Sequence, residues 1–280
     1  METRRYRGFT VPRLFKEISV NQEEAAERFY QRSIAGIRRI LQALRIDVTV
    51  VGAENIPATG GALIAGNHTG YLDFALMGVG PHIRGKRLVR FMAKQSVFEV
   101  PVLGGILRKM NHVPVDRSKG ASSVSTAVAM LRSGNLVGIF PEGTISRSFE
   151  LAHFKTGAAR IAHAADVPLI PMVTWGSQRV WTKDLPKRLH HVPVIVHYGE
   201  PVELTGDAEA DTAELKAQMQ LLLDAAREEY AQTHGPFGAE AWLPRSMGGT
   251  APTVEEADEL YRLEKEARAE RKRARKRERR

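Results

Sequence analysis

Residues 63–73 have the sequence LIAGNHTGYLD, in which a short apolar run ends in a polar turn that contains glycine. The apolar run predicts a buried strand, and the turn predicts that a helix begins near Asp73. His68 and Asp73 are five residues apart, which on one helix would separate their side chains by roughly 140°. If the two side chains touch, a turn must bring them together, and we expect Gly66 and Gly70 to supply the φ values that it needs.

A histidine held by a carboxylate is suited to proton transfer. The carboxylate fixes one ring nitrogen as a donor and leaves the other free to accept a proton, so the pair acts as a general base. No serine or cysteine beside His68 offers an obvious nucleophile, and we therefore interpret His68 as the group that activates a substrate hydroxyl. The alternative is a polar turn in which Asp73 only caps the following helix.

The composition indicates one large α/β domain with extensions. The chain has 280 residues, 43% of them hydrophobic, and no cysteine, which excludes disulfides and thiolate chemistry. We expect neither a secretory signal nor a spanning helix, because no run approaches the ~18 uncharged apolar residues that a span needs. Any membrane contact would therefore be peripheral.

The net charge of +9 is concentrated at the C-terminus, where residues 263–280 hold ten Lys and Arg against four Glu. We divide the chain into an N-terminal amphipathic helical segment (1–46), a catalytic domain (47–234) and a loop with a charged basic tail (235–280). The tail has little to bury, which predicts a solvated helix or a disordered arm.

Residues 20–45 are predicted to form a basic amphipathic helix, because apolar residues recur at helical spacing with arginines among them. Such a helix can lie on an anionic membrane. The alternative is a helix packed on the protein's own core.

Between the two ends, short β-rich runs alternate with helical segments, which favours an α/β fold with a largely parallel central sheet flanked by helices. The predicted strands are 47–51, 62–65, 88–93, 112–115, 136–140, 169–173 and 192–198. The predicted helices are 73–79, 96–107, 122–133, 155–165 and 212–231.

Three later stretches also place polar or rigid residues at strand ends. Residues 139–144 carry Glu142, which could hydrogen-bond a polyol or an orienting group, and residues 112–117 end in an acid–base pair. Residues 167–171 bracket a strand with prolines. The alternatives are ordinary strand ends, a surface ion pair and a rigid edge.

Together these sites resemble the glycerolipid acyltransferase family of the lysophosphatidic acid type. Its histidine block is matched by His68 and Asp73, and its Phe-Pro-Glu-Gly-Thr block is matched letter for letter by residues 140–144. Its second block is matched by Arg117 after a strand, and its fourth by residues 167–171. The pair at 93–94 and the stretch 154–157 also look like the family, and the resemblance spans roughly residues 48–203.

The resemblance implies a mechanism. His68 would remove the proton of the acceptor hydroxyl as it attacks an acyl thioester, and Asp73 would stabilise the imidazolium. Backbone N–H groups of the glycine-containing turns are candidate donors for the oxyanion. No acyl-enzyme, metal or cofactor is expected beyond the thioester co-substrate. The implied substrate-binding residues are Glu142, Gly143, Thr144, Lys94, Arg117 and Arg147.

One position departs from the family, which commonly has an arginine after Glu-Gly-Thr, where this chain has Ile145. Either Arg147 reaches the same anion, or the acceptor head group differs.

The expected function is transfer from acyl-CoA or acyl carrier protein to lysophosphatidic acid, giving phosphatidic acid. The expected place is the cytoplasmic face of the cell membrane, with an anionic membrane surface and a lysophospholipid as partners and no specific nucleic acid. The alternatives are another acceptor (glycerol phosphate, another lysophospholipid or a glycolipid), thioester hydrolysis, or lipid binding without chemistry.

Overall fold

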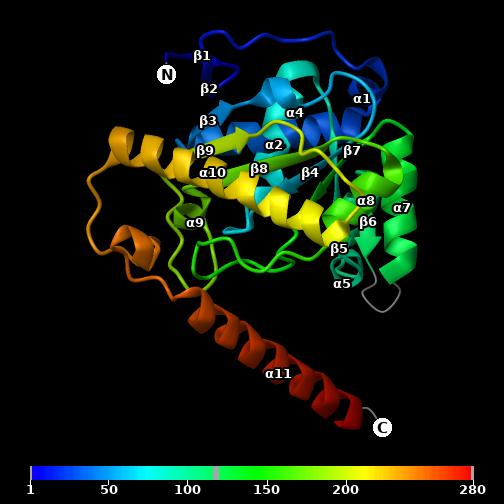
Figure 1. Cartoon of the computed structure of the whole chain (residues 1–280). Coiled ribbons are helices and arrows are strands. Elements are labelled where there is room, and N and C mark those ends of the chain that lie inside the picture. The colour runs from blue at the N-terminus through cyan, green and yellow to red at the C-terminus, as the bar shows by residue number, and fades with distance from the viewer. Residues whose placement is uncertain (1, 116–119, 279–280) are drawn as a thin grey trace.

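The computed structural model describes residues 2–115 and 120–278. In these residues nine strands form one sheet, and helices cover both of its faces (Figure 1). The strands are β1 (Thr3–Tyr6), β2 (Phe9–Pro12), β3 (Asp47–Val51), β4 (Ala62–Gly66), β5 (Val89–Lys94), β6 (Val113–Val115), β7 (Leu136–Ile139), β8 (Leu169–Trp175) and β9 (Pro193–Tyr198). The α-helices are α1 (Gln22–Ala26), α2 (Arg28–Ala43), α3 (Asp73–Met77), α4 (Val79–Gly85), α5 (Gln95–Phe98), α6 (Leu103–Lys109), α7 (Gly120–Arg132), α8 (Gly157–Ala165), α9 (Ser177–Val180), α10 (Ala208–His234) and α11 (Val254–Glu278), with short 3₁₀ helices η1 (Ala53–Asn55) and η2 (Arg245–Met247).

The strands lie in the order β1-β2-β3-β9-β8-β4-β7-β5-β6. Neighbours are parallel except for two pairs, β1 with β2 and β8 with β9. This confirms the predicted α/β fold with a largely parallel central sheet. Because β8, β4 and β7 are parallel neighbours, their carboxyl ends lie side by side.

Two apolar cores lie on the two faces of the sheet. Successive side chains of a strand point to opposite faces, and in β4 Ile64 belongs to one core while Leu63 and Ala65 belong to the other. Helices α2, α3 and α4 contribute to the first core, and α7, α8 and α10 to the second. Every residue of β4 is buried, which explains why this run is apolar throughout instead of alternating.

The predicted elements are confirmed to within a few residues, but the predicted helices 20–45 and 96–107 are each split into two, and the predicted helix 73–79 is followed by a further helix, α4, that was not predicted. Gly78, a poor helix former, separates α3 from α4, and Pro101, which lacks a backbone N–H, lies between α5 and α6. Between α1 and α2, Glu27 leaves the helical conformation with ψ 68°, and its carboxylate pairs with Arg90.

The N-terminal residues form a hairpin that the sequence pattern did not indicate. β1 and β2 are joined by Arg7 and Gly8, which have φ values of 48° and 88°, and β2 pairs in parallel with β3. Phe9 and Val11 of β2 are buried in the first core. The residues before β3 therefore extend the same sheet and the same core as the rest of the domain.

Helix α2 packs part of its apolar side against the protein. Tyr30 and Leu41 are buried, and Ile37 packs against the first core. The Tyr30 hydroxyl donates to the carbonyl oxygen of Val89 at 2.5 Å. The exposed large apolar side chain of α2 is Ile40, at 59%.

A buried ion pair fixes α1 to the domain. Arg87 is 1% exposed and donates from Nε to Oε1 of Glu24 at 2.9 Å. Its other nitrogens donate to the carbonyl oxygens of Pro57, Gly60 and Gly134. One guanidinium thus joins α1 to the loops before β4 and β7.

We expect Glu24→Ala to lower the free energy of unfolding by about 3–5 kcal/mol, because it leaves a buried guanidinium without its ionic partner. Denaturant unfolding of the variant and the wild type measures the difference. Glu23→Ala is the matched control, since Glu23 is the exposed neighbour on the same helix, and its effect should stay within about 0.5 kcal/mol. Similar losses in both variants would contradict a special role for the ion pair.

Candidate active site

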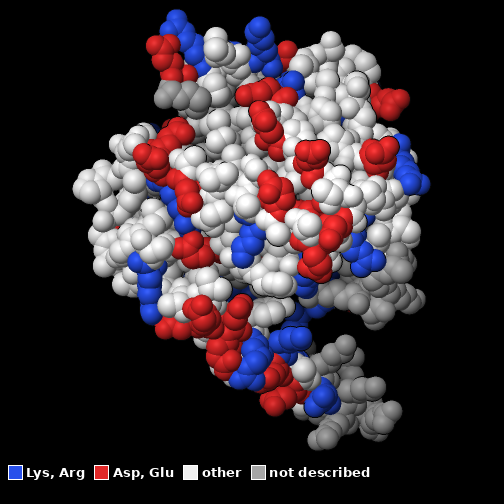
Figure 2. Space-filling view, in the orientation of Figure 1, with Lys and Arg blue, Asp and Glu red and all other residues white. Residues whose placement is uncertain are grey.

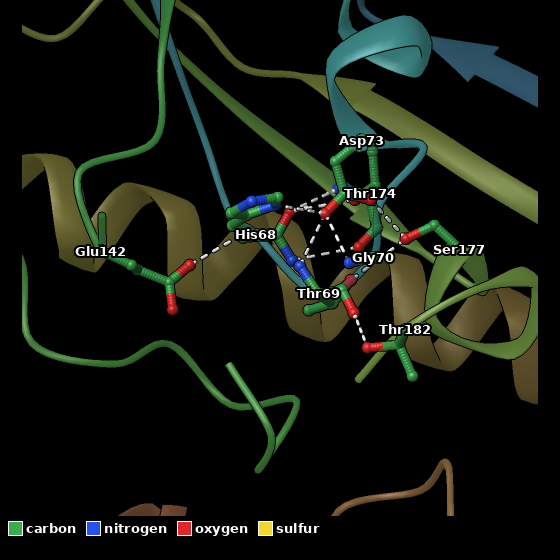
Figure 3. A network of polar contacts seen from close by, with 9 residues as sticks. His68, Thr69, Gly70, Asp73, Glu142, Thr174, Ser177 and Thr182 are labelled. Atoms are coloured by element: carbon green, nitrogen blue, oxygen red, sulfur yellow. Dashed lines mark hydrogen bonds and ion pairs between the residues drawn. The ribbon is translucent and has the colours of Figure 1, made fainter. Parts of the chain in front are cut away.

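Three polar turns meet at the carboxyl edge of the sheet. β4, β7 and β8 are parallel neighbours, and they are followed by His68, Glu142 and Ser177 respectively. In open α/β sheets, the crevice outside the carboxyl ends of the strands is where ligands bind. Figure 3 shows these residues gathered around one turn, although they lie far apart in the chain.

The side chains of His68 and Asp73 are in contact. Nδ1 of His68 lies 3.0 Å from Oδ2 of Asp73, and the turn between β4 and α3 brings them together. A carboxylate only accepts hydrogen bonds, so Nδ1 carries the proton and Nε2 carries the lone pair. Asp73 is the first residue of α3, as expected, but its carboxylate turns back toward His68 and does not cap the helix.

The carboxylate of Asp73 is fully buried and accepts five hydrogen bonds (Figure 3). Oδ2 accepts from the N–H groups of Thr69 and Gly70, both at 2.7 Å, and from the imidazole. Oδ1 accepts from the hydroxyl of Ser177 at 2.6 Å and from that of Thr174 at 3.2 Å. Donors in this number compensate the cost of burying a charge.

Gly66 and Gly70 lie where neighbouring atoms leave little room for a side chain, and φ does not explain them. Neither has a positive φ, so the expectation that they supply unusual backbone angles was wrong. A Cβ on Gly70 would lie 3.0 Å from the carbonyl oxygen of Trp181 and 3.1 Å from that of Ser177. One on Gly66 would lie 2.6 Å from Cε of Met77. A side chain at Gly70 would press on two backbone carbonyl groups, whereas one at Gly66 would require the end of the Met77 side chain to move.

The imidazole of His68 is held on its face as well as on its edge. Its ring stacks on that of Phe140, with centroids 4.3 Å apart and an interplanar angle of 19°. The His68 side chain remains 22% exposed. The residue that follows β7 therefore supplies a platform for the ring while leaving part of it accessible.

Glu142 holds the backbone of the His68 turn. Its Oε1 accepts from the N–H of His68 at 2.8 Å, and its Oε2 accepts from the N–H of Ala152 at 3.1 Å. Burial raises the pKa of Glu142 to about 8, although the two N–H donors act in the opposite direction. Both carboxylate oxygens are engaged with the backbone, so in this structure Glu142 is a positioning residue.

Thr174, Ser177 and Thr182 belong to the site although the sequence did not single them out. The first two donate to the aspartate, and Thr182 donates to the carbonyl oxygen of Thr69 at 2.6 Å. Asn67 exchanges two hydrogen bonds with the backbone of Thr174, and so continues the pairing of β4 with β8. All three hydroxyls follow the proline-bracketed stretch 167–171, with which β8 begins. Because that stretch was predicted to be a strand of the same sheet, polar residues after it could have been predicted to lie near the site.

The expected substrate-binding residues lie at several places around the turn. Lys94 ends β5 and is exposed. Gly143 has a φ of 68° in the turn after β7, and the Thr144 hydroxyl lies 3.5 Å from Nζ of Lys183. Arg117 lies outside the described residues.

The departure from the family pattern at Ile145 has a structural counterpart. Ile145 is 6% exposed, so the position where the family has an arginine is filled by a buried apolar side chain. Two residues on, the Arg147 side chain is 12% exposed and pairs with Asp184 and with Glu264 of α11. Arg147 is thus a cation held by carboxylates near the turn.

Comparison with known proteins agrees with this geometry. A sequence model of the family described as Acyltransferase matches residues 47–175. The chain is 37% identical over 145 residues to a 1-acyl-sn-glycerol-3-phosphate acyltransferase of Bacillus subtilis, a match that covers 51% of this chain and 69% of the relative. It is 30% identical over 168 residues to a chloroplastic 1-acyl-sn-glycerol-3-phosphate acyltransferase of Brassica napus, covering 56% of this chain and 47% of that one.

A longer match, to an uncharacterised protein of Mycobacterium leprae, is 26% identical over 263 residues and covers 81% of this chain and 70% of the relative. Among solved structures, a 1-acyl-sn-glycerophosphate acyltransferase of Thermotoga maritima shares the fold, with a TM-score of 0.58 and 24% identity over 74% of this chain and 83% of that one. The family match includes both the His68 and the Glu142 turns, and the Bacillus relative is matched over more than two thirds of its length. The chain belongs to the glycerolipid acyltransferase family.

Proposed function

We propose that this protein transfers a fatty acyl group from an acyl thioester to the free hydroxyl of lysophosphatidic acid, giving phosphatidic acid. The observation that carries the proposal is the His68–Asp73 pair, an oriented base at the carboxyl edge of the sheet. Relatives named as 1-acyl-sn-glycerol-3-phosphate acyltransferases support this acceptor. Acyl-CoA and acyl carrier protein both supply the required thioester.

The proposed reaction needs no covalent intermediate on the protein. Nε2 of His68 takes the proton of the acceptor hydroxyl as its oxygen attacks the thioester carbonyl carbon. The tetrahedral oxyanion collapses, the C–S bond breaks, and the imidazolium returns the proton to the departing thiolate. Asp73 stabilises the imidazolium between these two transfers.

The oxyanion must find its donors outside the His68 turn. The N–H of His68 donates to Glu142, and those of Thr69 and Gly70 donate to Asp73. The sequence made these N–H groups candidate donors for the oxyanion, but in the structure they hold the carboxyl groups that position His68. We propose that Lys94, which ends β5 at the same edge, and Arg117 contribute to holding substrate phosphate.

A membrane surface is the natural source of this acceptor, because a lysolipid and its diacyl product are amphiphiles. No helix in the described part of the chain is long and apolar enough to cross a bilayer. Exposed apolar side chains gather instead around the loop between α5 and α6, and we call Val100, Val102, Leu103 and Ile106 the α5–α6 ridge. We propose that this ridge makes a peripheral contact at the cytoplasmic face of the membrane.

Val102 is the tip of the ridge. It is 80% exposed and has φ 66° and ψ −57°, in a tight turn where the N–H of Leu103 donates to the carbonyl oxygen of Pro101 at 2.7 Å. A β-branched residue at positive φ is strained, and strain of this kind gathers at sites of function. Two exposed cations, Arg108 and Lys109, end α6 and suit anionic head groups.

One assay separates the proposed transfer from its alternatives. The protein is incubated with acyl-CoA and lysophosphatidic acid, and free thiol and lipid product are followed together. Equal release of both supports transfer, thiol without lipid indicates hydrolysis, and neither indicates binding without chemistry or another acceptor. A panel of glycerol phosphate, lysophospholipids and a glycolipid then tests the acceptor.

We expect His68→Ala to reduce the turnover number by roughly 10²–10⁴-fold, the range typical of a lost general base. Asp73→Asn should also reduce it, because an amide neither stabilises the imidazolium nor accepts all the bonds of the carboxylate. Initial rates with acyl-CoA and lysophosphatidic acid measure the effect, and circular dichroism checks the fold. Near-normal turnover in a folded His68→Ala variant would refute the assignment.

The raised pKa of Glu142 predicts how stability depends on pH. Its pKa is 4.5 in the unfolded chain and about 8 in the folded one, so between these values the folded state holds more protons. The free energy of unfolding should therefore fall as pH rises from 4.5 to 8, by at most about 1.4 kcal/mol per pH unit from this group. Urea unfolding of wild type and Glu142→Gln at several pH values tests this, since the variant should lose that part of the slope. Parallel slopes would show that Glu142 is ionised throughout.

Replacing Val102 and Ile106 together by Asp should lower binding to anionic vesicles by at least about tenfold, because each apolar side chain buried in the membrane contributes about 1.5–3 kcal/mol. Co-sedimentation with phosphatidylglycerol vesicles measures it. Ile40→Asp, on the exposed side of α2, is the control. Loss of binding in the control alone would place the membrane contact on α2.

A further inference from the structure

Two cations beside the His68 turn share one carboxylate from the C-terminal helix. Oε2 of Glu264 accepts from Nζ of Lys183 and from Nη2 of Arg147, both at 3.0 Å. The side chains of the two cations are 15% and 12% exposed, whereas that of Glu264 is 45% exposed. The cations are thus set into the surface, and the carboxylate comes to them from outside.

The cation pair is attached directly to the catalytic turn. The N–H of Ser146 donates to the carbonyl oxygen of His68 at 2.8 Å, and the next residue is Arg147. On the other side, the Thr182 hydroxyl donates to the carbonyl oxygen of Thr69, and the next residue is Lys183. Both cations therefore follow residues that hydrogen-bond to the two residues at the centre of the site.

The pair carries charge and donors suited to an anion larger than a carboxylate. Arg147 also pairs through Nε with Asp184, so the three side chains without Glu264 have a net charge of +1. The Thr144 hydroxyl lies 3.5 Å from Nζ of Lys183. A planar guanidinium and an ammonium offer more donors than one carboxylate oxygen uses, and a phosphate monoester presents three oxygens to such a set.

Besides this ion pair, helix α11 contacts the rest of the protein through Glu256, which pairs with Arg245, and through Tyr261, whose ring lies under Lys183. In its described part no side chain is buried, and the partly covered residues Val254, Ala257 and Tyr261 lie on the face that Glu264 continues. Figure 1 shows α11 extending away from the domain, and Figure 2 shows acidic and basic side chains along its exposed surface. The Glu264 side chain is 45% exposed, so solvent reaches its side of the ion pair and a ligand can displace it from the two cations.

We propose that Lys183 and Arg147 form the site that binds the phosphate of the acceptor, and that Glu264 of α11 occupies this site as an internal competitor. Acceptor binding then requires Glu264 to leave. The proposal rests on the proposed acyltransferase function, because the phosphate belongs to the acceptor of that reaction. It also gives the C-terminal helix a role, since α11 sets the acceptor concentration at which the enzyme works.

If Glu264 only anchored α11, the effect of its removal on acceptor affinity would differ in direction from the effect that the proposal predicts. If the carboxylate only anchored α11, its removal would leave acceptor affinity unchanged or lower it. If it competes with the phosphate, its removal must raise acceptor affinity. The two roles are therefore separated by the direction of one measured change.

The test uses the full chain with Glu264→Gln and, as the matched control, Glu266→Gln, whose carboxylate pairs with Arg262 of the same helix. In Glu264→Gln the KM for lysophosphatidic acid should fall by about fivefold, the size expected when a surface ion pair no longer competes, with kcat and the KM for acyl-CoA unchanged. Lys183→Gln should raise the acceptor KM by more than about tenfold, since a bond between charged groups is lost. An unchanged or higher acceptor KM in Glu264→Gln, or an equal fall in Glu266→Gln, overturns the proposal.

A binding measurement separates this proposal from the proposed function. Isothermal titration with sn-glycerol 3-phosphate, and with inorganic phosphate as a second probe, reports on the cation pair without any acyl transfer. Tighter binding of sn-glycerol 3-phosphate by Glu264→Gln and its loss in Lys183→Gln support the site even if no acceptor is acylated. Tighter binding of inorganic phosphate alone would show an unspecific anion site and overturn the assignment to the acceptor. Transfer activity with no difference between wild type and Glu264→Gln in either experiment overturns the proposal and leaves the acyltransferase function intact.

Discussion

The candidate site depends on one buried charge, the carboxylate of Asp73. It is tolerated in the interior because five donors surround it, two from the backbone of its own turn, one from His68 and two from hydroxyls at the end of β8. Removing any of these donors would leave a charge undersatisfied in a region that excludes water. The same bonds shape the turn after β4 and fix which nitrogen of His68 carries the proton. The hydrogen bonds of Asp73 therefore determine both the conformation of the turn and the protonation pattern of His68.

The order of the strands decides which residues meet that carboxylate. β4 lies between β7 and β8, so three strands that end at Gly66, Ile139 and Trp175, far apart in the sequence, reach one edge of the sheet. β7 delivers Phe140 to the face of the imidazole and Glu142 to the backbone beneath it. β8 delivers Thr174 to the far side of the aspartate. β7 and β8 thus supply different kinds of contact to the turn after β4. Because the ends of these strands meet at one edge of the sheet, the sequence blocks that form the site all lie at strand ends.

The sequence predicted the parts of this arrangement that depend on local pattern. The apolar run 62–65, the turn and the start of a helix at Asp73 all follow from short-range propensity, and they were confirmed. The N-terminal hairpin was missed because its strands, Thr3–Tyr6 and Phe9–Pro12, are only four residues long and depend on the pairing of β2 with β3. Gly66 and Gly70 were explained by φ, whereas what distinguishes them in the structure is crowding by residues distant in the sequence, among them Met77 and Trp181. Thr174 and Ser177 are ordinary hydroxyls about 100 residues from Asp73, and only the pairing of β8 with β4 gives them a role.

The stacking of His68 on Phe140 has a consequence for the entropy of the reaction. A surface histidine samples several rotamers, and a catalyst that relied on one would have to select the productive orientation at every turnover. Here the edge of the ring is held by Asp73 and its face by Phe140, so its torsional freedom is already lost in the folded protein. The side-chain entropy of His68 is therefore lost when the protein folds, and not in each catalytic cycle. The packing of the whole sheet compensates this loss. Each arriving acceptor then meets a base whose direction is set before it binds.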